Sequence, residues 1–130
     1  MKILVSMMFA LLLVAPVHAL ETEDFTQSRF EALQAQNALV LVDIFAAWCS
    51  TCARQHEILA DYREQHPGVD LHILSVDFDQ DRQTVRGFRA PRQSTLLLFK
   101  GDQQHWFSVA ETRPEVIFHE INRAAAFGEQ

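Results

Sequence analysis

The chain has few of the residues that would point to several common classes of protein. Only two of its 130 residues are cysteines, so it cannot build the network of disulfides that stabilises many small secreted proteins. It shows no internal repeat, linker or low-complexity tract, which excludes a repeat protein. It also has no run of basic side chains, and its arginines are spread among acidic residues, so we expect no nucleic-acid binding.

The longest apolar segment lies at the N-terminus and is too short to span a bilayer. Lys2 precedes an apolar run over residues 3–17, and the run ends in Val17-His18-Ala19. A transmembrane helix needs about 20 apolar residues, whereas a short run with a basic start and a small final residue is typical of a secretory signal peptide. The sequence predicts a signal peptide at residues 1–19, a single domain at residues 20–130 and a periplasmic or otherwise exported protein. An uncleaved membrane anchor is the alternative.

Strand-like and helix-like segments alternate along the rest of the chain. Apolar residues three to four apart predict helices, and continuous or alternating apolar residues predict strands. The predicted helices are residues 28–36, 49–66, 80–88 and one that starts after Thr112, and the predicted strands are residues 38–45, 69–78, 95–100 and 105–109. Ser28 with Glu31, and Thr112 with Glu115, are expected to cap the first and last helices. This order predicts an α/β domain.

The two cysteines lie where the first long strand gives way to a helix. Unpaired backbone N–H groups and the positive end of the helix dipole would favour the thiolate form of Cys49. Cys52 follows three residues later, on the same helical face, and could resolve a mixed disulfide that Cys49 forms. The pair therefore indicates redox chemistry, with Cys49 as nucleophile and Cys52 as resolving thiol.

A Cys-X-X-Cys pair has two other uses. A disulfide between residues so close together would be a weak structural staple, because it closes a very short loop. Zinc sites also use this spacing, and His56 could supply a third ligand, but a structural zinc needs a fourth and no other histidine has ligand spacing. We predict no metal and no organic cofactor, and we interpret His56 as a surface residue or a minor electrostatic influence on the thiols.

Two residues near the cysteines carry further expectations. Asp43 stands six positions before Cys49 in an otherwise apolar strand. We expect it to be buried, with a raised pKa, and to exchange a proton with Cys52, unless the strand twists enough to let Asp43 reach solvent. Trp48 would either shield the thiols and offer an apolar platform to a substrate or pack at the rim of the core.

Two segments carry a resemblance to a known family. Val42-Asp43-Ile44-Phe45-Ala46-Ala47-Trp48-Cys49-Ser50-Thr51-Cys52 resembles V-D-F-W-A-x-W-C-x-x-C, the active-site segment of the thioredoxin superfamily, and Ser94-Thr95-Leu96-Leu97-Leu98-Phe99-Lys100-Gly101 resembles its P-T-L-L-L-F-K-x-G strand. The resemblance implies a single thioredoxin-like domain whose central mixed β-sheet has helices on both faces, with the first family strand short or missing before residue 28. It also implies that Cys49 is the nucleophile, Cys52 the resolving thiol and Asp43 the buried acid.

The main departure from the family pattern is Ser94, which replaces a proline that has a cis peptide bond and helps to hold substrate. A cis bond before serine would cost about 2.5–4 kcal/mol, so we expect Gln93–Ser94 to be trans. Pro91 could take the cis position if the loop rearranged. We predict that Trp48, Ser94 and Thr95 bind substrate, in a loop altered by the loss of the proline. The smaller side chain could also open a coordination position for a metal or cluster shared by two chains.

A second departure concerns the buried acid. Family members often have a lysine near it on the neighbouring strand, and Ser75 takes that position here. The sequence therefore predicts that Asp43 lacks a charge partner and holds its proton more tightly.

Taken with the resemblance, the residues predict a monomeric thiol–disulfide oxidoreductase that acts on protein or peptide disulfides. We favour a reductase, which would need a membrane redox partner as its electron donor. The alternatives are a non-catalytic binding module with a redox-sensitive latch, and a metal-binding protein of the same fold.

Overall fold

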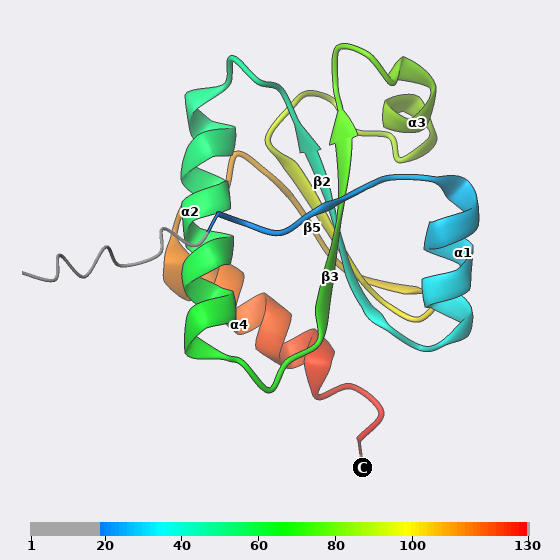
Figure 1. Cartoon of the computed structure of the whole chain (residues 1–130), viewed down its shortest axis with the longest axis vertical. Helices are drawn as coiled ribbons and strands as arrows, with labels where there is room; N and C mark the ends of the chain where they lie inside the picture. The colour runs from blue at the N-terminus through cyan, green and yellow to red at the C-terminus, as the bar shows by residue number, and fades with distance from the viewer. Residues whose placement is uncertain (1–18, 130) are drawn as a thin grey trace, which may run out of the picture.

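The computed structural model describes residues 19–129, which form a five-stranded sheet with helices on both faces (Figure 1). Apart from Ala19, the predicted signal peptide lies outside these residues, and no helix among them is long and apolar enough to cross a membrane. In chain order the elements are β1 (Glu23–Asp24), α1 (Gln27–Ala35), β2 (Leu39–Phe45), α2 (Ser50–Gln65), β3 (Leu71–Asp77), α3 (Arg82–Gly87), β4 (Thr95–Lys100), β5 (Gln103–Val109) and α4 (Pro114–Ala125).

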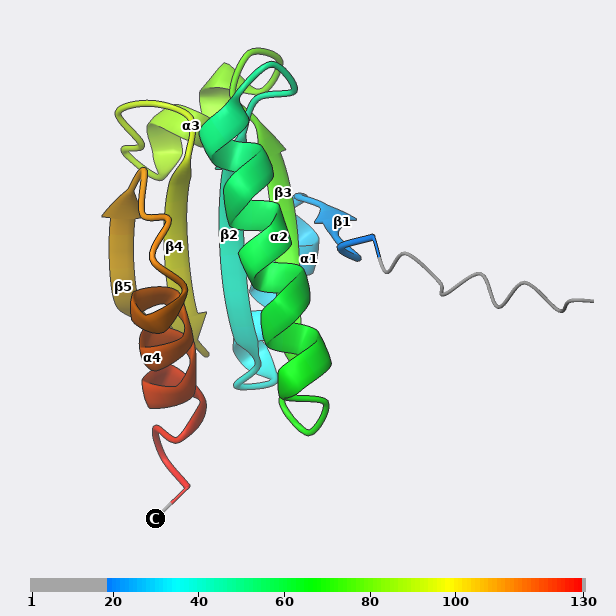
Figure 2. The ribbon, with the colours of Figure 1, turned by 90° about the vertical axis from the view of Figure 1, so that its left-hand side faces the viewer.

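The sheet is mixed, and β2 lies at its centre. The strand order is β1-β3-β2-β4-β5, with β3 parallel to β1 and β2, and β4 antiparallel to β2 and β5 (Figure 2). The predicted mixed sheet is confirmed. The first strand, β1, has only two residues, which agrees with the short or missing first strand that the resemblance to the thioredoxin superfamily implied.

Each face of the sheet has its own apolar core. The helices α2 and α4 cover one face and α1 and α3 cover the other, as Figure 1 shows. The α2/α4 core contains Leu41, Ile58, Tyr62, Leu98 and Ile117, among others. Side chains alternate along a strand, and Asp43 is two residues from Leu41. Asp43 therefore points to the α2/α4 face.

The first helix has a different cap from the predicted one. It begins at Gln27, and Thr26 is its N-cap: the backbone of Thr26 is extended, and its hydroxyl accepts a hydrogen bond from the Arg29 N–H. Ser28, the predicted cap, lies within the first turn. A residue with helical backbone angles cannot turn its side chain back onto the first N–H groups, so the prediction was wrong by two positions.

The cap of the last helix was also predicted wrongly. Arg113 is the N-cap of α4 and makes no side-chain capping bond, while Pro114 takes the first helical position. The carboxylate of Glu111 accepts a hydrogen bond from the Arg113 N–H at 3.0 Å. A carboxylate two residues before the N-cap thus binds this N–H, and the Thr112 hydroxyl does not cap the helix.

Candidate functional site

The cysteines lie where α2 begins, directly after the end of β2. Cys49 is the N-cap of α2, and its sulfur accepts a hydrogen bond from the Cys52 N–H at 3.2 Å. Both cysteines are free thiols, and only 7% of Cys49 and 1% of Cys52 is exposed. The extended backbone of an N-cap turns the Cys49 sulfur toward the free N–H groups of the first turn.

The environments of the two sulfurs push their pKa values apart. Burial opposes ionisation of Cys49, but hydrogen bonds from the Cys52 thiol, the Ser94 hydroxyl and the N–H groups of Cys52 and Thr51 outweigh it, so its pKa is lowered. Burial raises the pKa of Cys52, and donation of its S–H to Cys49 raises it further. The first thiol is therefore more easily ionised than the second.

Ser94 lies beside the cysteines because of the sheet topology. The strand β4 runs antiparallel to β2, so its first residue, Thr95, pairs with Ile44 near the end of β2. Ser94 is completely buried, and its hydroxyl oxygen is 3.1 Å from the Cys49 sulfur and 3.2 Å from the Cys52 sulfur.

The described residues contain no cis peptide bond, so Gln93–Ser94 is trans as predicted, and the alternative of a cis bond at Pro91 is wrong.

Asp43 is completely buried, which confirms the prediction and rules out the twisted strand. Its charge partner, however, was missed. The Nε2 atom of His56 lies 2.6 Å from Oδ2 of Asp43. The hydrogen bond to Asp43 raises the pKa of His56, so the prediction that Asp43 lacks a partner because Ser75 replaces a lysine is wrong.

The sequence contained a signal for His56. This residue lies four positions after Cys52, and residues four apart share a helix face. His56 therefore lies on the same face of α2 as the Cys52 thiol and points toward the sheet, while a third of its side chain stays exposed. His56 links a buried carboxylate to solvent.

Gln55 is a second residue that the sequence did not single out. It is completely buried in α2, and its amide Nε2 donates to the backbone oxygens of Ser94 at 3.2 Å and Glu111 at 3.0 Å. A glutamine on a helix that carries several other polar residues gives no signal of burial. Through these two bonds, the Gln55 amide holds the loop that contains Ser94 against α2.

The other two predicted substrate-binding residues lie in contrasting places. Trp48 is 67% exposed, and its indole N–H donates to Asp79 Oδ2 at 2.7 Å, so it is not a core-rim residue. Thr95 is completely buried, and its hydroxyl donates to the Arg92 oxygen at 2.6 Å. The side chain of Trp48 is open to a partner and that of Thr95 is enclosed. The roles of Trp48, Ser94 and Thr95 in substrate binding stay predictions.

The donor groups in this region do not gather into a metal site. Within residues 19–129, no three or more histidine, cysteine or acidic side chains are placed to hold a metal ion. His56, the suggested third zinc ligand, is bonded to Asp43.

A family model of thioredoxin matches residues 18–123. The chain belongs to the thioredoxin family. Yeast thioredoxin-1 (Saccharomyces cerevisiae) is 34% identical over 83 residues, which are 64% of this chain and 79% of the yeast protein. The thioredoxin of Mycobacterium bovis is 33% identical over 69 residues, 53% of this chain and 59% of that protein.

Solved structures of other proteins show the same fold. The crystal structure of Trxlp from Edwardsiella tarda is 34% identical, with a TM-score of 0.72, and the match covers 78% of this chain and 98% of that one. Mitochondrial thioredoxin 3 of Saccharomyces cerevisiae shares the fold at 20% identity, with a TM-score of 0.67, over 78% of this chain and 94% of that one. As a thioredoxin-family member with the Cys49–Cys52 pair, the protein is a thiol–disulfide oxidoreductase.

Proposed function

We propose that this protein is an exported, monomeric reductase of protein or peptide disulfides. The Cys49 thiolate attacks a client disulfide, forms a mixed disulfide and releases one client thiolate. Cys52 then loses its proton and attacks the Cys49 sulfur, which releases the second client thiolate and leaves a Cys49–Cys52 disulfide. The client gains two electrons, and a membrane electron donor restores the dithiol. The N-terminal apolar segment supports export.

The observation that carries this proposal is the unequal placement of the two thiols. Cys49 caps the helix, and its sulfur accepts a hydrogen bond from the Cys52 N–H, whereas the Cys52 side chain is almost completely buried. Cys49 keeps 7% of its surface exposed and ionises more easily, whereas Cys52 is 1% exposed and stays protonated, which suits attack by the first thiol and resolution by the second.

Resolution needs an acceptor for the Cys52 proton. In this proposal the acceptor is Asp43, and His56 passes the proton to solvent. The arrangement that supports it is a buried carboxylate whose Oδ1 has no hydrogen-bond partner and whose Oδ2 meets a histidine that is a third exposed. Histidine changes charge near neutral pH, so it can take up and release the proton under ordinary conditions.

Two cysteine variants test the proposal. Cys49→Ser should lose disulfide reduction in an assay that supplies a small dithiol as reductant, because Cys52, the other free thiol, is almost completely buried and cannot reach a client disulfide. Cys52→Ser should accumulate mixed disulfides with several client proteins, which gels without reductant detect. Wild-type activity in Cys49→Ser would refute the proposed enzymatic function. Trapping of a single partner by Cys52→Ser would favour the non-catalytic binding module.

The reduction potential of the pair separates the two directions of electron flow. A reduction potential of about −270 mV, as in thioredoxin, supports the reductase, while a reduction potential of about −120 mV identifies an oxidant. Equilibration with glutathione or dithiothreitol buffers measures it.

A further inference from the structure

The hydroxyl of Ser94 touches both sulfurs of the cysteine pair. Its oxygen lies 3.1 Å from the Cys49 sulfur and 3.2 Å from the Cys52 sulfur. The family proline that Ser94 replaces has no hydrogen-bond donor at this point. This chain therefore places a polar group between its two redox sulfurs.

The hydroxyl is held in place by the backbone around it. Ser94 has a φ angle of +63°, a conformation that is uncommon for residues other than glycine. Its carbonyl oxygen accepts hydrogen bonds from the Ala110 N–H at 2.9 Å and the Gln55 amide at 3.2 Å. These bonds attach Ser94 to the residue that follows β5 and to α2, so the hydroxyl oxygen is in position before any substrate arrives.

The number of available hydrogens sets the direction of the bonds. A serine hydroxyl has one hydrogen to donate, and a thiolate can only accept. When Cys49 is the thiolate, Ser94 donates its one hydrogen to the Cys49 sulfur, because the charge makes that sulfur the stronger acceptor. The single hydrogen of the Cys52 thiol has two acceptors beside it, the Cys49 sulfur and the Ser94 oxygen.

The negative charge moves from one sulfur to the other once Cys49 has formed a mixed disulfide with a client. The Cys49 sulfur is then a neutral disulfide sulfur, and the charge develops on Cys52 as it loses its proton. Only 1% of Cys52 is exposed, so water cannot solvate that charge. The freed Ser94 hydroxyl can rotate and donate to the Cys52 sulfur.

We propose that Ser94 is a catalytic residue whose single hydroxyl stabilises the two thiolates in turn, first Cys49 during attack and then Cys52 during resolution. The step order rests on the proposed function. The hydroxyl keeps its own hydrogen throughout. The Cys52 proton leaves toward Asp43, and the electron pair of the Cys52 thiolate forms the Cys49–Cys52 bond as the client thiolate departs.

Removal of the hydroxyl tests this role. In Ser94→Ala, alkylation of Cys49 by iodoacetamide should shift to higher pH by about one unit, and resolution of a preformed mixed disulfide should slow by roughly ten- to a hundred-fold. Ser94→Gly also removes the hydroxyl and tolerates the positive φ angle, so it replaces the alanine variant if that one does not fold. Ser108→Ala is the matched control, because its buried hydroxyl on β5 has no hydrogen-bond partner.

The two measurements give separate outcomes. An unchanged alkylation profile in both Ser94 variants overturns the role in attack, and an unchanged resolution rate overturns the shared role. A loss of equal size in Ser108→Ala would show a general effect of the substitution and also overturn it. Alkylation of Cys49 needs no client, so it tests the hydroxyl even if the wild-type protein reduces no client disulfide and the proposed function fails.

Discussion

At the scale of single residues, the Asp43–His56 pair is the most specific feature of this chain. A buried carboxylate without a partner is costly, and in this protein the partner comes from α2 instead of the neighbouring strand, where Ser75 stands opposite Asp43. A lysine at that position would stay charged up to high pH. Histidine titrates near neutrality, so the charge balance beside the thiols responds to pH in the physiological range.

This pairing predicts a pH-dependent contribution to stability. Asp43 raises the pKa of His56 above its ordinary 6.5, so the stabilisation is fully present below pH 6.5 and disappears as the pH rises through the raised value. His56→Gln should therefore lower the free energy of unfolding more at pH 5.5 than at pH 9, by roughly 1 kcal/mol after allowance for solvent screening. Urea unfolding of the reduced protein at both pH values measures the difference.

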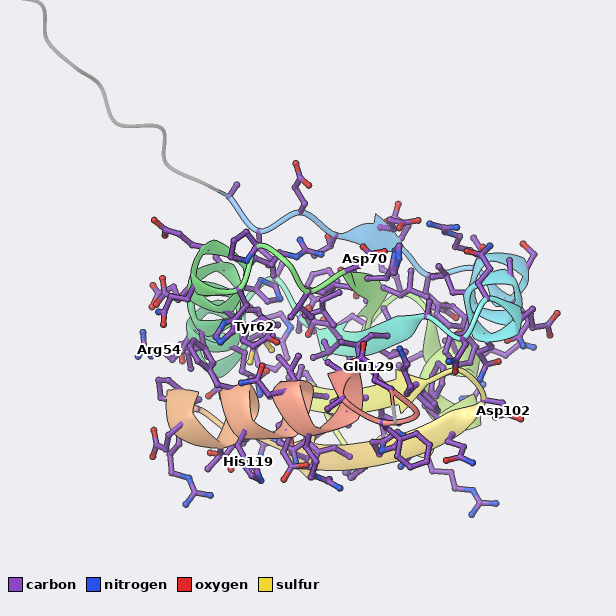
Figure 3. The ribbon with its side chains drawn as sticks, turned by 90° about the horizontal axis from the view of Figure 1, so that it is seen from below. Arg54, Tyr62, Asp70, Asp102, His119 and Glu129 are labelled. Carbon is purple, nitrogen blue, oxygen red and sulfur yellow. The ribbon has the colours of Figure 1, made fainter. Side chains whose placement is uncertain are left out.

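A second histidine provides the control for this experiment. His119 is exposed on α4, as its outward position in Figure 3 shows. His119→Gln should change the free energy of unfolding little at either pH. An equal loss at pH 5.5 and pH 9 in His56→Gln would contradict the ionic contribution.

At the scale of elements, the first two turns of α2 assemble most of the site. Cys49 caps the helix, Cys52 and Gln55 lie one turn apart, and His56 follows. Farther along, Tyr62 donates from α2 to Asn122 of α4 at 2.7 Å, and Figure 3 shows its side chain between the two helices. This bond and the shared core of α2 and α4 hold the redox helix against the sheet.

The corrected cap of α1 gives a prediction at this scale. Thr26→Ala should lower the free energy of unfolding by about 1 kcal/mol, because the Arg29 N–H loses its acceptor. Ser28→Ala, at the cap that the sequence suggested, should change it by a few tenths at most, since alanine suits the helix interior. Urea unfolding of both variants gives the comparison, and a larger loss in Ser28→Ala would contradict the observed cap.

At the scale of the whole molecule, the mixed sheet brings the two halves of the site together. The cysteines follow the end of β2, and Ser94 precedes the antiparallel strand β4, forty-five residues after Cys49 in the sequence.

The proposed export adds a processing step before the domain acts. Expression in a bacterium with a periplasm should give a mature chain that begins at Leu20, measured by intact mass. A full-length chain retained in the membrane would instead identify an anchor.

The sequence by itself determined the features that depend on local pattern: the alternation of strands and helices, the Cys-X-X-Cys pair at a strand–helix junction, and the burial of Asp43 in an apolar strand. Apolar periodicity and motif spacing act over a few residues, so they can be read without a fold. The tertiary structure alone decided the partners of those residues. His56 meets Asp43, Gln55 holds the Ser94 loop, and Ser94 touches both sulfurs because packing joins elements that no local pattern connects.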